Sequence, residues 1–259
     1  MSKEFKSKID TQSESFLKNR AEMLKKIKEM RNLEKRSFNA SESKRKKFED
    51  RNQLTPRERL NALIDPDSEF IELYNMAGFL VEDNNPETSI PGASVIAGIG
   101  FIKGVRCMIM VDDSGINAGA ATSTTVDKCV GCLEISLEKK LPFVHLVESA
   151  GINLMNYKVE IWARAGGMFA GLAKLSAAGV PTITILHGLS TAGGAYNVGM
   201  SDYVIGVKKN GMAALAGPAL LKAATNEVAS NKELGGSEMH ATVSGSVSYT
   251  HLTLPTRLS

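Results

Sequence analysis

A glycine pair, Gly193-Gly194, follows the uncharged, β-branched run of residues 180–186 in the stretch V-P-T-I-T-I-L-H-G-L-S-T-A-G-G-A-Y. The run predicts a strand buried on both faces, and the small residues after it predict the start of a tightly packed helix. The first N–H groups of a helix have no partner within it, and glycine lets a ligand approach the main chain closely. This arrangement favours stabilisation of an oxyanion by backbone N–H donors.

A second stretch has the same design. Residues 141–151, L-P-F-V-H-L-V-E-S-A-G, form another apolar run that ends in the small residues Ser149, Ala150 and Gly151. Two buried strands that each end in a small-residue turn are able to supply one N–H donor apiece to a single thioester oxygen. The alternative is that the glycines serve only close packing in an α/β protein.

Alternating strand and helix patterns predict how the two turns are held. Residues 93–99 and 105–112 predict a hairpin around Lys103-Gly104. The helical stretches 126–140 and 159–178 each lead directly into one of the apolar runs. The order strand, helix, strand, helix, strand favours an α/β fold with parallel pairing and crossover helices.

The N-terminal region differs from the rest in charge. Residues 1–60 carry 18 Lys/Arg against 10 Asp/Glu, whereas the remaining residues carry 13 against 18. Apolar residues near helical spacing predict one or two long amphipathic helices over residues 1–50. The basic cluster of residues 44–47 has acidic neighbours and no interleaved aromatics, which favours a solvated face or a subunit contact over nucleic-acid binding. Thr55, Pro56 and Glu58 then predict a capped helix, with a strand expected over residues 69–73.

The composition predicts neither a metal site nor a membrane segment. Cys129 and Cys132 form a single C-x-x-C inside a helical pattern, which favours two buried thiols over zinc or redox chemistry. No phosphate-binding or dinucleotide-binding motif occurs. The first residues lack the apolar core of a signal peptide, and glycines, Lys174 and Pro181 interrupt the most apolar region. A cytoplasmic location is therefore expected.

Several long motifs in order resemble one family. They are L-T-P-R-E-R-L-N-A-L-I-D-P-D-S-E-F-I-E-L, L-E-K-K-L-P-F-V-H-L-V-E-S-A-G, A-G-G-A-Y, and L-A-G-P-A-L-L-K-A-A-T-N-E-V with L-G-G-S-E-M-H and V-S-G. Together they resemble the N-terminal half of the carboxyltransferase (β) subunits of biotin-dependent acyl-CoA carboxylases, of the methylcrotonyl-, geranyl- and propionyl-CoA carboxylase type. The likeness covers residues 20–247, and the last group is most similar to the methylcrotonyl-CoA and geranyl-CoA branch.

The resemblance implies a crotonase-like (ClpP/crotonase) spiral of ββα units with a helical N-terminal arm. The expected division is a charged arm over residues 1–53, an acyl-CoA-binding domain over 54–247 and an atypical tail over 248–259. The implied activity is transfer of a carboxyl group from carboxybiotin to an acyl-CoA. The implied partners are a biotin carboxylase or biotin carboxyl carrier subunit, which bears the biotin, and further copies of the chain in a homo-oligomer.

The resemblance also assigns the site. Ala150 and Gly151 match the family's Gly-Gly pair after a strand, and Gly193 and Gly194 take the helix-starting position, so these four residues are expected to stabilise the enolate. Acyl-CoA contacts are expected from neighbouring residues in the two turns: Ser149, Ala192, Ala195 and Tyr196.

In the mechanism that the family implies, biotin serves as the base, and the protein supplies proximity and anion stabilisation. His145 and Glu148 are accordingly expected to be structural, and His187 is either structural or in contact with site residues. Lys222 is either a solvated lysine or a ligand of a CoA phosphate.

The sequence differs from the family in two respects, and two other functions are alternatives. Family subunits are about twice as long, and residues 246–259 do not resemble the family's sequence after the V-S-G motif, which suggests a truncated or misjoined end. The alternatives are a biotin-dependent acyl-CoA decarboxylase subunit and a non-catalytic assembly subunit.

Overall fold

The computed structural model describes residues 6–152 and 158–251. Its order is α1 (Glu14–Glu42), α2 (Arg45–Glu49), α3 (Pro56–Leu63), β1 (Ile71–Glu72), β2 (Val95–Ile102), β3 (Val105–Asp112), a 3-10 turn η1 (Asn117–Gly119), α4 (Ser123–Lys139), β4 (Phe143–Val147), α5 (Val159–Ala177), β5 (Thr182–Leu186), β6 (Leu189–Thr191), α6 (Gly193–Gly199), β7 (Tyr203–Val207), β8 (Met212–Ala214), α7 (Pro218–Thr225), α8 (Asn231–Gly235), α9 (Ser237–Met239), a π-turn η3 (His240–Ser244) and β9 (Tyr249–His251).

The main sheet has the strand order β1-β2-β3-β4-β5-β7-β9, and the pair β6-β8 forms a second, smaller sheet. β2 and β3 are the predicted hairpin, and β3, β4 and β5 pair in parallel as predicted. β7, a strand that the sequence did not predict, pairs in parallel with β5. From β5 onward the chain runs through β5-β6-α6 and β7-β8-α7, two successive ββα units. In each unit the first strand joins the main sheet and the second strand joins the small one.

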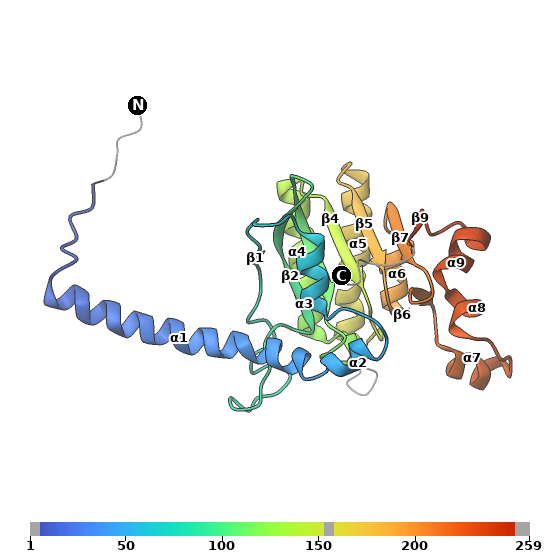
Figure 1. Ribbon diagram of the computed structural model, residues 1–259, viewed down its shortest axis with the longest axis horizontal. Helices are drawn as coiled ribbons and strands as arrows, with labels where there is room; N and C mark the ends of the chain where they lie inside the picture. The colour runs from blue at the N-terminus through green and yellow to red at the C-terminus, as the bar shows by residue number, and fades with distance from the viewer. Residues whose placement is uncertain (1–5, 153–157, 252–259) are drawn as a thin grey trace.

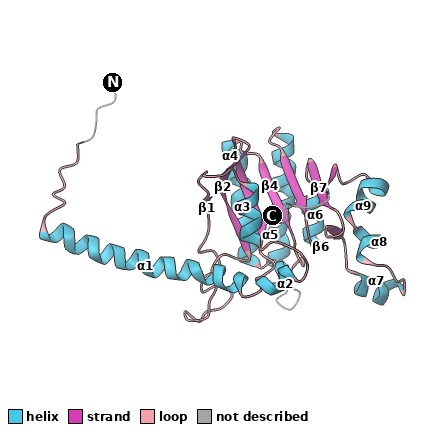
Figure 2. Ribbon diagram, viewed as in Figure 1, coloured by secondary structure: helices cyan, strands magenta, loops and turns pink. Residues whose placement is uncertain are grey.

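Side chains that alternate along the central strands build a core on each face of the sheet. Met108 and Met110 pack with residues of α4 and α5 on one face. Ile109 and Val111 point to the other face, where Leu60 of α3 covers them. Figure 2 shows the strands in magenta at the centre of the body, with helices around them.

The predicted helical arm is present as α1 and α2. Ser13 caps α1, and Figure 1 shows this helix leaving the body as a long rod, with α7 and α8 at the opposite end of the molecule. The inner end of the arm is part of the body, because Phe48 is buried and Ser41 Oγ donates to Asp113 Oδ1 at 2.7 Å.

The helix boundaries follow local capping chemistry. Thr55 and Glu58 form the predicted capping box at the start of α3. The helix expected to start at residue 126 starts three residues earlier, because Thr122 caps it through the N–H of Thr125. The strand expected over residues 69–73 is shorter, since β1 pairs with β2 only at Ile71 and Glu72. Among the described helices, none combines the length and apolar character needed to cross a membrane.

Candidate active site

The turn after β4 is held on both sides by hydrogen bonds. Ser149 N–H donates to Leu189 O, and Thr191 N–H donates to Ser149 O, each at 3.0 Å. Ser149 Oγ donates to Gly119 O at 3.0 Å and accepts the N–H of Gly151 at 3.1 Å. The Gly151 amide is therefore engaged within the turn. The N–H of Ala150, an exposed residue, has no partner in the part of the chain that the structure describes.

The turn after β6 begins α6, as the sequence predicted. Ala192, just before the helix, has a φ of 50°, and its N–H donates to Ala214 O at 3.1 Å. A positive φ at a residue with a Cβ is a strained conformation that the surrounding structure has to hold. The next two N–H groups, those of Gly193 and Gly194, bond to no group within residues 6–152 and 158–251.

The two turns lie against each other. A Cβ added to Gly194 would lie 3.0 Å from the Cβ of Ser149, and a Cβ added to Gly151 would lie 3.3 Å from that of Ala192. The backbones approach this closely only because glycine stands at both positions. A Cβ added to Gly193, in contrast, would meet no atom of the described residues within 4 Å.

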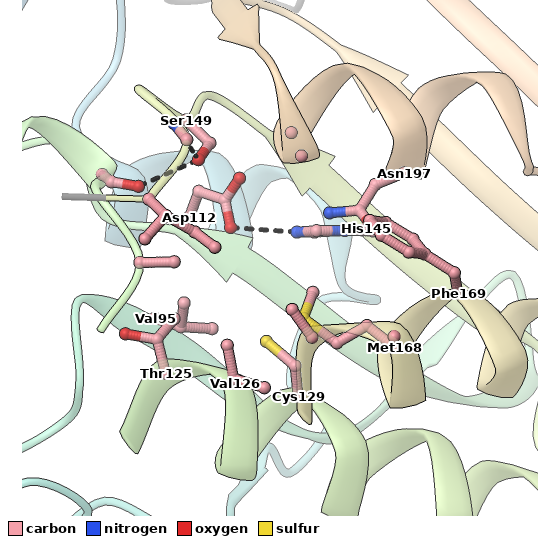
Figure 3. Close-up of a pocket in the computed structure, with 18 of the residues that line it drawn as sticks. Val95, Asp112, Thr125, Val126, Cys129, His145, Ser149, Met168, Phe169 and Asn197 are labelled. Carbon is pink, nitrogen blue, oxygen red and sulfur yellow. Dashed lines mark hydrogen bonds and ion pairs between the residues drawn. The ribbon is translucent and has the colours of Figure 1, made fainter. Parts of the chain in front are cut away.

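Both turns open onto a cavity of about 160 Å³ between α4, α5 and α6. Its lining is mostly apolar and comprises Val95, Asp112, Gly119, Ala121, Thr125, Val126, Cys129, His145, Ser149, Gly151, Ile152, Trp162, Ala165, Gly166, Met168, Phe169, Gly193, Gly194 and Asn197. Figure 3 shows Val95, Thr125 and Val126 on one side of it, with Asn197 and Phe169 on another.

Four of the predicted site residues thus line one cavity: Ser149, Gly151, Gly193 and Gly194. The other four, Ala150, Ala192, Ala195 and Tyr196, are absent from the lining. Ala195 packs against the core beside Val198. The ring of Tyr196 is half exposed and lies 5.2 Å from that of Phe169, a lining residue.

The carboxylate and the imidazole in the cavity lining, those of Asp112 and His145, are bonded to each other. His145 Nε2 lies 3.0 Å from Asp112 Oδ1, and Asp112 Oδ2 accepts the N–H of Glu148 at 3.1 Å. His145 is 3 % exposed and has this partner, in line with the structural role predicted for it. The pair fixes the end of β4 just before the Ser149 turn.

Glu148 forms a buried ion pair. Arg59 Nη1 donates to Glu148 Oε2 at 2.7 Å, and Ser114 Oγ donates to the same oxygen at 2.9 Å. The guanidinium of Arg59 also stacks over the ring of Phe48 at 5.4 Å. The sequence predicted a structural hydrogen bond for Glu148 but gave no role to Arg59. Arg59 lies on the same helical face as Leu60 and Leu63, and this position is the feature of the sequence that indicates a buried side chain.

His187 is buried next to this pair, with Nδ1 3.9 Å from Glu148 Oε2 and neither ring nitrogen bonded within the described residues. Desolvation, helped by the nearby charge of Arg59, lowers the pKa of His187 well below its usual value. The histidine is therefore neutral at neutral pH, and it does not line the cavity.

Lys222 and the cysteines lie in different surroundings. Lys222 is on α7 and is not part of the cavity lining. Cys129 and Cys132 are buried in α4, and burial raises the pKa of Cys132 to about 11. In the described ranges no three His, Cys, Asp or Glu side chains are grouped so as to hold a metal ion.

The sequence matches the carboxyl transferase domain over residues 47–253, most of the chain. The chain belongs to the carboxyl transferase domain family. Among its relatives is a probable biotin-dependent acyl-coenzyme A carboxylase beta2 subunit of Mycobacterium tuberculosis, 45% identical over 77% of this chain and 36% of the relative. Another is the mitochondrial methylcrotonoyl-CoA carboxylase beta chain of Arabidopsis thaliana, 38% identical over 93% of this chain and 41% of the relative.

A solved carboxyltransferase has the same fold. The beta subunit of geranyl-CoA carboxylase from P. aeruginosa superposes with a TM-score of 0.87 and 41% identity, over 96% of this chain and 46% of that one. This likeness confirms the predicted crotonase-like fold and the resemblance to the N-terminal part of acyl-CoA carboxylase β subunits. The chain spans less than half the length of these relatives.

Proposed function

We propose that this chain is the acyl-CoA-binding part of a carboxyltransferase subunit that moves a carboxyl group from carboxybiotin to an acyl-CoA. The observation that carries the proposal is the pair of adjoining turns, whose unpartnered N–H groups within the described residues flank a largely apolar cavity. Such a cavity suits an acyl chain, and amides fixed at its edge suit the negative oxygen of an enolised thioester.

The amides of Ala150, Gly193 and Gly194 are the proposed oxyanion donors, since these have no other partner in the described chain. Gly151 supports them by closing the turn onto Ser149 Oγ. In enzymes with such holes, removing one donor lowers kcat by about 10²–10³. Ser149 and the neighbouring residues Ala192, Ala195 and Tyr196 are proposed to frame the entrance for the thioester.

The cavity residues fit a reaction whose base comes from outside this chain. Asp112 and His145 bind each other, and among the described lining residues no other side chain is a carboxylate or an imidazole. Carboxybiotin, carried by a separate domain or subunit, supplies the carboxyl group and the basic ureido group when it is bound. The chain itself contributes orientation of the acyl group, exclusion of water and stabilisation of the thioester oxygen.

The cavity volume suggests the size of the acyl group. A closed apolar cavity of about 150 Å³ binds benzene, and the cavity here measures about 160 Å³. Acyl groups of about four to six carbon atoms therefore fit by the same comparison, and longer chains fit only if the cavity opens.

The proposed partners are a biotin carboxylase or biotin carboxyl carrier subunit and further copies of this chain. Related proteins are described as beta subunits, which supports a multi-subunit assembly. Leu17, Met23 and Leu24 are about half exposed on α1, which supports burial of this helix in a homo-oligomer. The cytoplasmic location stays a prediction, because some relatives are described as mitochondrial.

The test is calorimetry of the purified chain with short, branched and long acyl-CoAs. Gly193→Ala adds a methyl group that meets no atom of residues 6–152 and 158–251 within 4 Å, so among the described residues it has room and obstructs only a ligand. We expect acyl-CoA affinity to fall at least tenfold with unchanged thermal stability. Gly199→Ala is the matched control, because an added Cβ there also meets no described atom within 4 Å and Gly199 lies outside the cavity lining.

Failure of every CoA thioester to bind, with retained binding of a biotin-carrying partner, would instead support a non-catalytic assembly subunit. Equal affinities of wild type and Gly193→Ala would show that the thioester does not approach this turn.

A further inference from the structure

One polar side chain in the cavity lining has no role in the proposed chemistry. Asp112 and His145 bind each other, Thr125 Oγ1 donates to Ala93 O, and Ser149 Oγ donates to Gly119 O. Trp162 also has a partner. The side-chain amide of Asn197, in contrast, bonds to no group within residues 6–152 and 158–251.

Asn197 is held firmly in place. It is 7 % exposed, and its backbone carbonyl accepts from Ser201 Oγ at 2.8 Å and from Thr184 Oγ1 at 3.5 Å. It follows Gly193 by four residues in α6, so the two share a face of the helix. Side chains in a helix tilt toward its N-terminus, which brings this amide back toward the Gly193 turn. Figure 3 shows Asn197 among the residues around the cavity.

The amide lies among mostly apolar residues of the cavity lining, so a group in the cavity is able to supply the hydrogen bonds that the described chain does not. An amide offers both a donor and an acceptor, so its natural complement is a group that also does both, such as a hydroxyl. A carboxylate fits poorly, because the described part of the lining has no Lys or Arg and includes the carboxylate of Asp112.

We propose that Asn197 selects an acyl group that carries a hydroxyl oxygen beyond the thioester. The proposal rests on the proposed function, because it takes the thioester oxygen to lie at the Gly193 turn. Four residues of helix rise about 6 Å, and the tilt of the Asn197 side chain shortens that distance. The selected hydroxyl therefore belongs two or three carbons beyond the thioester carbonyl, at position 3 or 4 of the acyl chain.

The experiment compares acyl-CoAs of equal length by calorimetry on the whole 259-residue chain. Butanoyl-CoA is the reference, and 3-hydroxybutanoyl-CoA and 4-hydroxybutanoyl-CoA are the probes. One added hydrogen bond contributes about 0.5–1.5 kcal/mol, so we expect one hydroxylated ligand to bind up to about tenfold more tightly. Asn197→Leu keeps the bulk of the side chain, and we expect it to remove this preference and to strengthen binding of butanoyl-CoA.

Asn231→Leu is the matched control. It makes the same substitution at an exposed residue of α8 outside the cavity lining, so the ratio of affinities should stay as in wild type. Asn197→Ser, which retains a hydroxyl, should keep part of the preference, and the melting temperature of each variant shows whether it is folded.

The outcomes separate the two proposals. If neither butanoyl-CoA nor a hydroxylated analogue binds to wild type, the proposed function itself fails. If all three ligands bind equally well and Asn197→Leu leaves their ratio unchanged, acyl-CoA binding stands and Asn197 has no part in selection.

Discussion

Breaking the buried ion pair between Arg59 and Glu148 should cost more stability than any other single polar change in the site. The side chains are 1% and 7% exposed and lie 2.7 Å apart. Removing one partner of a buried pair leaves an uncompensated charge, which costs about 3–5 kcal/mol. Arg59→Met and Glu148→Gln should each lower the free energy of unfolding by about that amount.

The double variant Arg59→Met/Glu148→Gln removes both charges at once. Well-packed neutral residues often replace a buried ion pair at little cost. We therefore expect the double variant to lose less free energy of unfolding than the two single variants lose in sum. Urea denaturation followed by circular dichroism measures all four free energies. Arg57→Met is the control on the same helix, because Arg57 and Glu72 are 30% and 26% exposed. A solvent-accessible ion pair of this kind contributes about 0–1 kcal/mol to the free energy of unfolding.

If the two single changes add to the double within about 0.5 kcal/mol, they do not interact, and the reasoning fails. Acyl-CoA affinity provides a second measurement that tests the same ion pair. Glu148 directly precedes Ser149, so an unpaired Glu148 in Arg59→Met should also disfavour a negative oxygen at the turn, and Glu148→Gln should not.

Three further predictions concern pH, capping and the arm. The pKa of His187 is lowered in the folded state, so the unfolded chain binds the extra proton and stability should fall as pH drops below about 6.5. His187→Leu should flatten this fall in pH-dependent urea melts. Thr55→Ala removes the cap of α3 and should cost about 1 kcal/mol, whereas Thr55→Ser should retain most of it. Deleting residues 1–30 should leave the melting temperature nearly unchanged, but deleting residues 1–50 removes buried Phe48 and should lower it strongly.

The parts of the fold that follow from short-range patterns were predicted from the sequence. Continuous apolar runs marked the hairpin and the parallel strands β3, β4 and β5, and the Thr55–Glu58 box marked the start of α3. The small sheet was not predicted, because β6 and β8 have three residues each and pair across more than 20 residues of chain. Three-residue strands carry too little periodicity to be recognised.

The candidate site likewise combines features that consecutive residues encode with contacts between residues far apart in the sequence. The two glycine turns were visible because each is encoded by consecutive residues. Arg59 and Glu148 are 89 residues apart, and Ser149 and Gly119 are 30 apart, so nothing local indicates that they bind each other. Asn197 was missed for another reason: an asparagine within a short helix gives no sign of whether it faces solvent or a cavity.

The placement of charge in the candidate site is what the proposed oxyanion would require. Amides stabilise a negative oxygen more strongly in an apolar, water-excluding cavity than in water, but an unpaired carboxylate nearby would oppose it just as strongly. Two carboxylates, Asp112 and Glu148, lie next to the Ser149 turn, and each has a nitrogen partner, His145 or Arg59. The second of these partners comes from the helix that follows the arm and stacks on Phe48 of the arm itself. The arm therefore contributes to the electrostatics of the site as well as to its shape, and loss of Phe48 should weaken acyl-CoA binding even in protein that remains folded.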